Sequence, residues 1–193
     1  MSRRLLSRAL GILALAAFGA TAVGAGPAVA APGGSLAIRN VCYTTSQAGP
    51  YAGTADQAAS IWNNATANIN MAKCGSNVSI RYTTGGGSYA VRYSLGNGYV
   101  VIDTQQAAQY SPLRIMTHEL GHILGLPDNY NGNCAILMSG GSAGTSCTNP
   151  YPSSGEAAQV DRNFGSALSA TSSAADGATV FQDSWPAPAG ALR

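Results

Sequence analysis

The chain has 193 residues, of which 46% are hydrophobic and only 9% are charged, and its formal net charge is +2. This length suits one domain with a fair hydrophobic core. So small a charge excludes the strongly basic surface of a nucleic-acid-binding protein and also an acidic interaction tail.

The first 30 residues have the three parts of a secretory signal peptide. Three arginines lie among the first eight residues, residues 9–23 are apolar, and Ala28-Val29-Ala30 is a small-x-small cleavage site. A membrane anchor is the alternative, but the apolar run is short and Gly-Pro follows it, which favours a removed signal. We therefore expect a secreted, extracellular protein with no membrane partner. Losing this segment and its three arginines would turn 193 residues of charge +2 into 163 residues of charge −1.

Four cysteines fit the oxidising compartment that secretion implies. They are Cys42, Cys74, Cys134 and Cys147. Three connectivities are available, and proximity in the sequence favours Cys42–Cys74 and Cys134–Cys147. Each closed loop would contribute about 3–4 kcal/mol in the chain-entropy model. A cysteine-based zinc site is the alternative, but no Cys-x-x-Cys spacing supports it.

The first half of the mature chain has patterns of strands and one helix. Residues 36–45 alternate apolar and polar residues and predict the first strand. Thr54 and Gln57 form a capping box, which predicts a long helix that continues to about Lys73 and backs the sheet. Period-two or dense apolar patterns then predict three more strands, at residues 78–82, 89–93 and 99–103.

The next helix carries the motif His118-Glu119-Leu120-Gly121-His122, after Ser111 as N-cap and Pro112 as first residue. Because a helix advances about 100° per residue, the two histidines project from one face, one turn apart. Two imidazoles at this spacing can hold one Zn²⁺, while Glu119 can take a proton from the attacking water without binding the metal. The alternative is an ordinary amphipathic helix with two surface histidines.

A third ligand is expected directly after this helix. Gly125 can adopt the positive φ that ends a helix, and Pro127 prevents continuation, so the chain returns Asp128 toward the metal. Catalytic zinc usually has three protein ligands and a water, which predicts His118, His122 and Asp128. Glu156 is the alternative third ligand, as in thermolysin-like proteases. Its place in a second capping box, at the start of the last helix, favours a structural role instead.

The remaining segments carry two weaker candidates. Met138 is either a core filler or the floor beneath the zinc histidines, and the motif upstream favours the floor. Tyr130 is a candidate for steadying the oxyanion, or an exposed structural tyrosine. Residues 166–193 are Ala/Ser-rich and then Pro-rich, which predicts a loosely held C-terminal tail. The expected organisation is a signal peptide (1–30), a zinc metalloprotease domain (31–165) and this tail (166–193).

These residues resemble the snapalysin family, small secreted bacterial zinc endopeptidases of the metzincin group. The resemblance extends from about Ile61 to Arg162 and is most specific in residues 118–130, 137–141 and 146–152. It implies an α+β, metzincin-like zincin fold. Such a fold has a twisted mixed sheet of about four to five strands, a backing helix, an active-site helix and a C-terminal helix.

The resemblance also assigns roles to particular residues. It implies zinc on His118, His122 and Asp128, with Glu119 as the family's glutamate. It further implies that Met138 forms the methionine turn and that Cys134–Cys147 is the family disulfide. Cys42, Cys74 and the long tail are additions to the family pattern. Residues 110–113 lack the carboxylate with which such proteases hold calcium, so no calcium site is expected.

The expected activity is hydrolysis of peptide bonds in extracellular, casein-type proteins, with an aromatic residue after the scissile bond. Residues 99–103 are a candidate edge strand for pairing with an extended substrate. We expect a monomer whose partners are protein or peptide substrates and, as a further candidate, a secreted inhibitor. A secreted zinc-binding module without catalysis is the alternative, but the intact Glu119 argues against it. Residues 31–35 leave no room for a long propeptide, so latency is unexplained.

Overall fold

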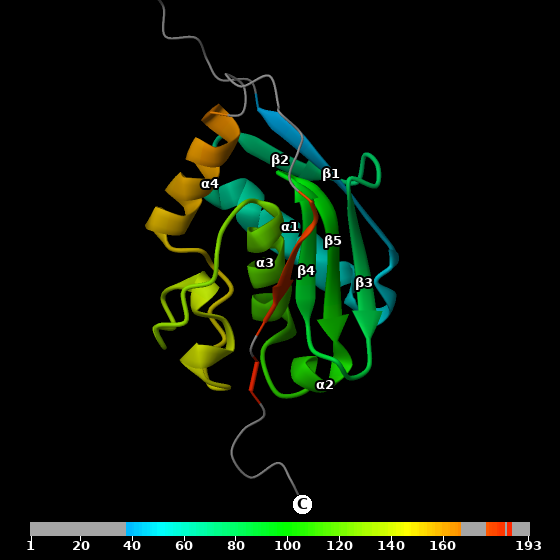
Figure 1. Ribbon diagram of the computed structural model, residues 1–193, viewed down its shortest axis with the longest axis vertical. Coiled ribbons are helices and arrows are strands. Elements are labelled where there is room, and N and C mark those ends of the chain that lie inside the picture. Colours follow the sequence, from blue (N-terminus) through cyan, green and yellow to red (C-terminus); the bar gives the residue numbers. More distant parts are fainter. Residues whose placement is uncertain (1–37, 167–176, 184, 187–193) are drawn as a thin grey trace, which may run out of the picture. The chain divides into compact units, whose positions relative to one another are not determined.

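The computed structural model describes residues 38–166, 177–183 and 185–186. The expected signal peptide lies outside these residues. The described elements, shown in Figure 1, are β1 (Arg39–Gln47), η1 (Gly49–Tyr51), α1 (Ala52–Ala65), β2 (Ile69–Ala72), β3 (Val78–Thr83), β4 (Tyr89–Ser94), β5 (Asn97–Asp103), α2 (Thr104–Ala107), α3 (Pro112–Ile123), η2 (Leu137–Ala143), α4 (Ser154–Ser166) and β6 (Thr179–Gln182). Among the described residues, none of the helices has the length and hydrophobicity needed to cross a membrane.

The strands form one mixed sheet in the order β2-β1-β3-β5-β4-β6. β1 pairs in parallel with β2 and β3, and β3 pairs in parallel with β5. β4 is antiparallel to both β5 and β6. The α+β architecture is the one expected from the sequence, but the sheet has six strands because β2 and β6 arise where a helix end and a tail were expected.

The long helix ends eight residues earlier than the expected Lys73. It stops at Ala65, and Thr66 turns extended with ψ 154° while its hydroxyl donates to the Trp62 carbonyl. Residues Ile69–Ala72 then form β2, in which the amide of Asn63 donates to the Met71 carbonyl and accepts from the Met71 N–H. The apolar stripe was misread because Ile69 continues the helical spacing of α1 and also alternates with Met71 as in a strand.

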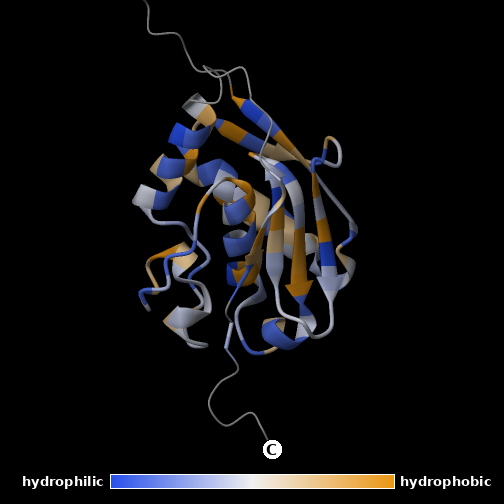
Figure 2. Cartoon of the chain, in the orientation of Figure 1, coloured by the Kyte–Doolittle hydropathy of each residue, from blue (hydrophilic) through white to orange (hydrophobic). Residues whose placement is uncertain are grey.

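One hydrophobic core joins α1, α3 and the sheet. Figure 2 shows hydrophobic residues along β5, and Val100 and Ile102 of that strand have no exposed surface. Trp62 of α1 is fully buried, and its indole N–H donates to the Thr117 carbonyl at 2.9 Å. Burying one large apolar side chain stabilises the fold by about 1.5–3 kcal/mol. Trp62 therefore fixes α1 against α3 beside His118.

The two ends of α3 form as the sequence predicts. The Ser111 hydroxyl accepts a hydrogen bond from Arg114 N–H, and Pro112 is the first helical residue. At the other end Gly125 has φ 97°, a conformation that favours glycine. The helix is therefore fixed in length and in the direction of its exit.

Both disulfides join the pairs expected from sequence proximity. Cys42–Cys74 ties β1 to the residues after β2, and Cys134–Cys147 brackets η2.

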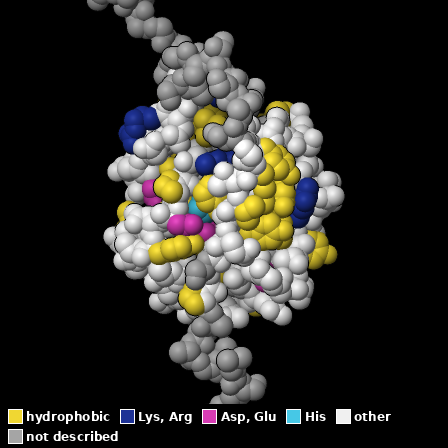
Figure 3. All heavy atoms as spheres, in the orientation of Figure 1, with side chains coloured by type: hydrophobic (Ala, Val, Ile, Leu, Met, Phe, Trp, Pro, Cys, Tyr) yellow, Lys and Arg dark blue, Asp and Glu magenta, His cyan; other side chains and the backbone are white. Residues whose placement is uncertain are grey.

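The outer face of the sheet carries a cluster of tyrosines, in which the rings of Tyr89 and Tyr93 lie 6.0 and 6.2 Å from that of Tyr99. Figure 3 shows hydrophobic side chains gathered over the strands.

Part of the C-terminal tail is held against the sheet, which corrects the expectation of a loosely held tail. β6 pairs with β4 from Tyr89↔Gln182 to Arg92↔Thr179 and crosses α3 in Figure 1. Beyond it, Trp185 is 4% exposed. The β4 edge offers unpaired N–H and C=O groups to β6, and Phe181 and Trp185 pack against the hydrophobic core.

Candidate metal centre

The two histidines of α3 point their Nε2 atoms at one place. These atoms are 3.2 Å apart, and both side chains are fully buried. The Nδ1 atoms lie 3.0 Å from the Leu137 carbonyl for His118 and 2.9 Å from the Leu126 carbonyl for His122. When each Nδ1 donates its proton there, each Nε2 keeps a free lone pair, which is how metal-binding histidines are oriented.

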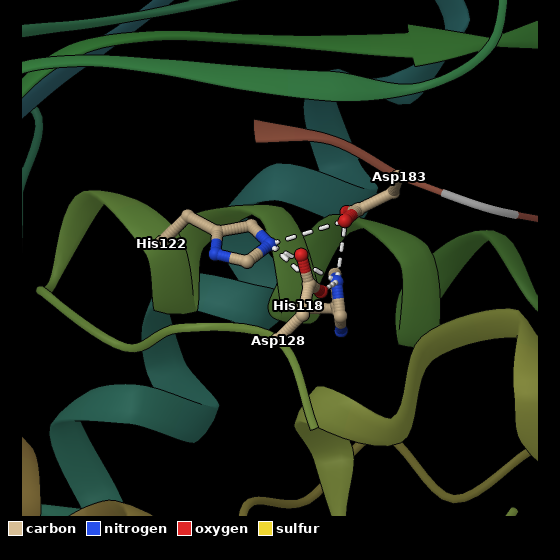
Figure 4. A group of neighbouring side chains, drawn as sticks. All are labelled: His118, His122, Asp128 and Asp183. Carbon is tan, nitrogen blue, oxygen red and sulfur yellow. Dashed lines mark hydrogen bonds and ion pairs between the residues drawn. The ribbon is translucent and has the colours of Figure 1, made fainter. Parts of the chain in front are cut away.

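Asp128 completes a third corner of the same site, as Figure 4 shows. Its Oδ1 lies 3.4 Å from the Nε2 of both histidines. Tetrahedral zinc with bonds of about 2.0–2.1 Å places its ligand atoms about 3.3–3.4 Å apart. The spacings of 3.2, 3.4 and 3.4 Å therefore fit a four-coordinate ion of this size.

A fourth potential ligand, Asp183, was missed by sequence reasoning. Its Oδ2 lies 2.7 Å from His118 Nε2 and its Oδ1 lies 3.3 Å from His122 Nε2. With the two histidines and Asp128 it forms a set of ligand atoms within 4.8 Å of one another. One signal was available: Val180, Phe181 and Trp185 interrupt the small and polar tail, and an apolar group of this kind usually packs against something.

The charges of this cluster also fit a divalent cation. Two aspartates approach two histidines in a largely buried space, and Asp128 Oδ1 lies 3.4 Å from the Nε2 of each histidine. Burying carboxylates is unfavourable by several kcal/mol unless positive charge balances them. An ion of charge +2 would balance both carboxylates and leave the imidazoles neutral. The donor set of two imidazoles and carboxylate oxygens is one that zinc accepts.

When no cation balances the carboxylates, protons take its place on the histidines. Burial alone lowers the pKa of His118, but the negative charge of Asp183 and hydrogen bonds to both aspartates outweigh burial and raise this pKa to about 9. A protonated imidazole cannot bind a metal. Metal binding at neutral pH must therefore release a proton from this pair.

Glu119 lies beside the cluster without joining it. Its side chain is fully buried, and neither carboxylate oxygen accepts a hydrogen bond. Burial, together with the charges of Asp183 and Asp128, raises the pKa of Glu119 well above the usual range, and the indole of Trp185 offsets part of this. A cation held by the neighbouring ligands would lower that pKa again. The position suits a group that moves a proton.

Comparison with known proteins agrees with this arrangement. Residues 38–167 match the model of the Streptomyces extracellular neutral proteinase (M7) family. The chain belongs to this family. The resemblance to snapalysins is thereby confirmed.

Named relatives are also similar over much of the chain. An extracellular small neutral protease of Streptomyces caespitosus is 44% identical over 124 residues, 63% of this chain and 93% of the relative. Proteins of the same name from Streptomyces coelicolor and Streptomyces lividans are 42% and 40% identical over 72% and 68% of this chain. The chain spans 65% and 59% of the length of those two relatives. Asp183 lies beyond the residues that match the family model.

The segment around Met138, which we call the floor, lies against α3 and close to His118 in this M7-family chain. A Cβ atom on Gly121 of α3 would lie 2.8 Å from the Met138 sulfur, so the methionine packs directly against the helix. A Cβ on Gly140 would lie 3.2 Å from Cε1 of His118. The floor is therefore close enough to limit the position of the imidazole.

Glu156, the alternative third ligand, lies outside the cluster of ligand atoms. Its capping box with Ser153 forms as predicted, because Ser153 N–H donates to the carboxylate and Glu156 N–H donates to Ser153 Oγ. The same carboxylate accepts from the N–H groups of Leu137 and Met138. Glu156 therefore joins α4 to the floor.

Arg114 is a second residue that sequence reasoning missed. It stands one turn before His118 on α3 and is 1% exposed, and burial lowers its pKa. Its guanidinium donates to the Asn149 and Ile136 carbonyls and to Ser139 Oγ, at 2.6, 3.0 and 2.9 Å. Its place on the histidine face of the helix was the available signal. Arg114 holds the disulfide-bracketed segment against α3.

Tyr130 reaches the edge of the centre. Its hydroxyl donates to Asp183 Oδ1 at 2.9 Å, while 45% of the residue stays exposed.

The expected edge strand at residues 99–103 is wrong, because β5 pairs with β3 on one side and β4 on the other. A dense apolar strand is buried on both sides, so it was the wrong strand to choose as an edge. β4 is the strand whose outer edge takes β6.

Proposed function

We propose that this chain is a secreted zinc-dependent endopeptidase. The observation that carries the proposal is the convergence of His118, His122 and Asp128 at tetrahedral spacing, with Glu119 beside them. Family membership and relatives named extracellular small neutral protease support it. Residues 1–30 would be the signal peptide and residues 31–165 the protease domain.

Zinc is the metal that best suits these ligands, and His118, His122 and Asp128 would hold it. When bound, zinc supplies a Lewis acid that polarises the scissile carbonyl and makes a water molecule more acidic. The carbonyls of Leu137 and Leu126 keep the two imidazoles in the tautomer that binds metal. The choice of zinc is supported by the spacing of the three ligand atoms, which matches zinc–ligand geometry.

Glu119 would act as the general base and then as the general acid. Its carboxylate takes a proton from the attacking water and passes that proton to the nitrogen of the departing amine. The buried position, free of competing hydrogen bonds, keeps both oxygens available for this transfer. Tyr130, whose hydroxyl reaches the centre, would donate a hydrogen bond to the oxyanion.

The substrate would be an extended segment of an extracellular, casein-type protein. It would pair antiparallel with the outer edge of β4, the edge that β6 takes in this structure. We expect an aromatic residue after the scissile bond, because the site already accommodates an aromatic ring next to the metal centre. That ring is Trp185, which lies 5.2 Å from the ring of Tyr110 and 5.4 Å from that of His118. The protease would act as a monomer, with a secreted inhibitor as a further partner.

Casein digestion tests this function. The zinc-loaded mature chain is assayed at high casein concentration, because β6 takes the same strand edge, and peptide ends are identified by mass spectrometry. We expect hydrolysis that 1,10-phenanthroline abolishes and added zinc restores, with new N-termini that are mainly Tyr or Phe. A zinc-loaded chain that releases no peptides would instead be a zinc-binding module.

A further inference from the structure

The C-terminal segment lies along the strand edge that a substrate would need. β6 extends the sheet at the edge of β4, where Ala90 pairs with Phe181 and Val91 with Val180. The Phe181 ring stacks on the His122 imidazole, with centroids 4.3 Å apart and an interplanar angle of 12°. The Arg92 guanidinium lies 4.8 Å from the centroid of the same ring. Backbone pairing and aromatic packing thus hold the segment over α3.

Asp183 follows this strand directly and enters the metal centre, as the close-up in Figure 4 shows. Its Oδ1 lies 3.3 Å from His122 Nε2, the spacing expected between two ligands of tetrahedral zinc, while its Oδ2 lies at hydrogen-bond distance, 2.7 Å, from His118 Nε2. The carboxylate also accepts the Tyr130 hydroxyl. Two histidines and Asp128 leave one open corner on zinc, and Asp183 is placed to fill it.

Trp185 anchors the segment on the other side of the centre. It is 4% exposed, and it packs edge-on against Tyr110 and against His118. The Tyr110 hydroxyl donates to the Pro186 carbonyl, and the Gln106 amide donates to the Trp185 carbonyl. The segment is therefore bound on both sides of Asp183.

These contacts close the centre. His118, His122 and Glu119 have no exposed surface, and acidic side chains lie near the middle of this face in Figure 3. An endopeptidase in this state cannot admit a polypeptide to the groups that would cut it. The closed centre offers an explanation for the latency that the sequence left unexplained.

From this geometry we infer that residues 179–183 and Trp185 form an intramolecular inhibitor, which occupies the β4 edge needed by a substrate and places the Asp183 carboxylate on the metal. The inference rests on the proposed function. The segment competes with substrate for the β4 edge and for the fourth metal position. Cleavage between α4 and β6 would remove the high effective concentration that tethering provides, and the short freed segment would dissociate. Proteolysis after export would thus activate the enzyme.

A competitive inhibitor built into the chain has a defined kinetic signature. It reduces the fraction of chains open to substrate, which raises the apparent KM without lowering kcat. We would compare the zinc-loaded mature chain with Asp183→Ala and Phe181→Ala, using a quenched fluorescent peptide. Ser60→Ala is the control, because Ser60 is exposed on α1, outside the proposed inhibitor. We expect both test variants to lower KM at least about tenfold with kcat within about twofold, and the control to match the unmodified chain.

A second readout does not depend on activity. Zinc transfer from each protein to a chromogenic chelator reports whether the centre is covered, and we expect faster transfer from Asp183→Ala than from Ser60→Ala. In another variant, a recognition site for a foreign protease is inserted within residues 167–176, so that the chain folds with its tail attached. Cutting it should speed zinc transfer and lower KM, and a synthetic peptide of residues 177–186 should then inhibit competitively.

Two results would overturn the inference. One is an Asp183→Ala chain with unchanged KM and unchanged zinc transfer. The other is a cut chain that behaves like the intact one after its tail fragment has been removed. If no zinc-loaded variant hydrolyses any peptide, the proposed function fails. The zinc-transfer rates then still decide whether the segment covers the metal.

Discussion

The carboxylate of Glu156 accepts a hydrogen bond of 2.7 Å from the backbone N–H of Met138. The first turn of α4 thereby supports the floor beneath His118. In a thermolysin-like site Glu156 would be the third ligand. Here both of its carboxylate oxygens accept hydrogen bonds elsewhere, from Leu137, Met138 and Ser153. The identity of the third ligand can therefore be tested against a structural carboxylate of the same chain.

Asp128→Ala should weaken zinc binding by more than about 100-fold, because removing a ligand exceeds the effect of losing an outer hydrogen bond. Asp128→His should keep the metal and part of the hydrolysis. Glu156→Ala should keep near-normal zinc affinity and lose about 2–4 kcal/mol of folding stability, since several buried N–H groups lose their acceptor. Zinc titration measures the affinity of each variant, and urea unfolding measures its folding stability. Normal zinc binding by Asp128→Ala, with loss in Glu156→Ala, would mean a thermolysin-like site.

Arg114→Leu should destabilise the fold and loosen the floor of the site. The change leaves the Asn149 carbonyl and Ser139 Oγ without the guanidinium donor, at about 1–3 kcal/mol for each group that stays buried, while the Ile136 carbonyl still accepts from Ser139. Thermal unfolding of the zinc-loaded chain measures the loss. The control is Lys73→Ala, which removes an exposed ion pair with Asp56 and should change little. Equal melting temperatures for the two variants would contradict the role given to Arg114.

Reducing Cys134–Cys147 should raise hydrogen exchange in the segment that carries Met138. The bridge brackets a stretch with few regular backbone hydrogen bonds, which opens more readily once the constraint is lost. Mass spectrometry of exchanged peptides before and after reduction would record the change, with β3 and β5 as internal references. A free Cys134 thiol found by titration of the secreted protein would contradict the premise.

Stability should fall in alkaline solution through Tyr43. Burial, and then the Asp56 carboxylate that accepts its hydroxyl, raise the pKa of Tyr43 to about 12 from an ordinary value of 10. Because the unfolded chain loses this proton first, the contribution is complete below about pH 10 and is lost as the pH rises toward 12. Urea unfolding at pH 9 and pH 11.5 should show a smaller decline for Tyr43→Phe than for the unmodified chain. Equal declines would exclude Tyr43 as the cause.

The parts predictable from sequence are those determined over short distances. The turn from His118 to Asp128 depends on helical spacing, one glycine and one proline, and the cap of α3 depends on Ser111 and Pro112. Asp183 reaches the same site from 61 residues beyond His122, through strand pairing that no local pattern records. The end of α1 was missed because Ile69 fits both a helical and a strand period, and Asn63 decides between them through a tertiary hydrogen bond.

Glu119→Gln tests the central claim most directly, because it separates metal binding from proton transfer in one protein. Glutamine keeps the size of the side chain but cannot accept the proton. The variant should keep zinc near one ion per chain by atomic emission, while its casein hydrolysis should fall by at least about 100-fold, in the range expected for a general base. Zinc lost together with activity would make Glu119 a ligand. Hydrolysis retained at the level of the unmodified chain would contradict the mechanism.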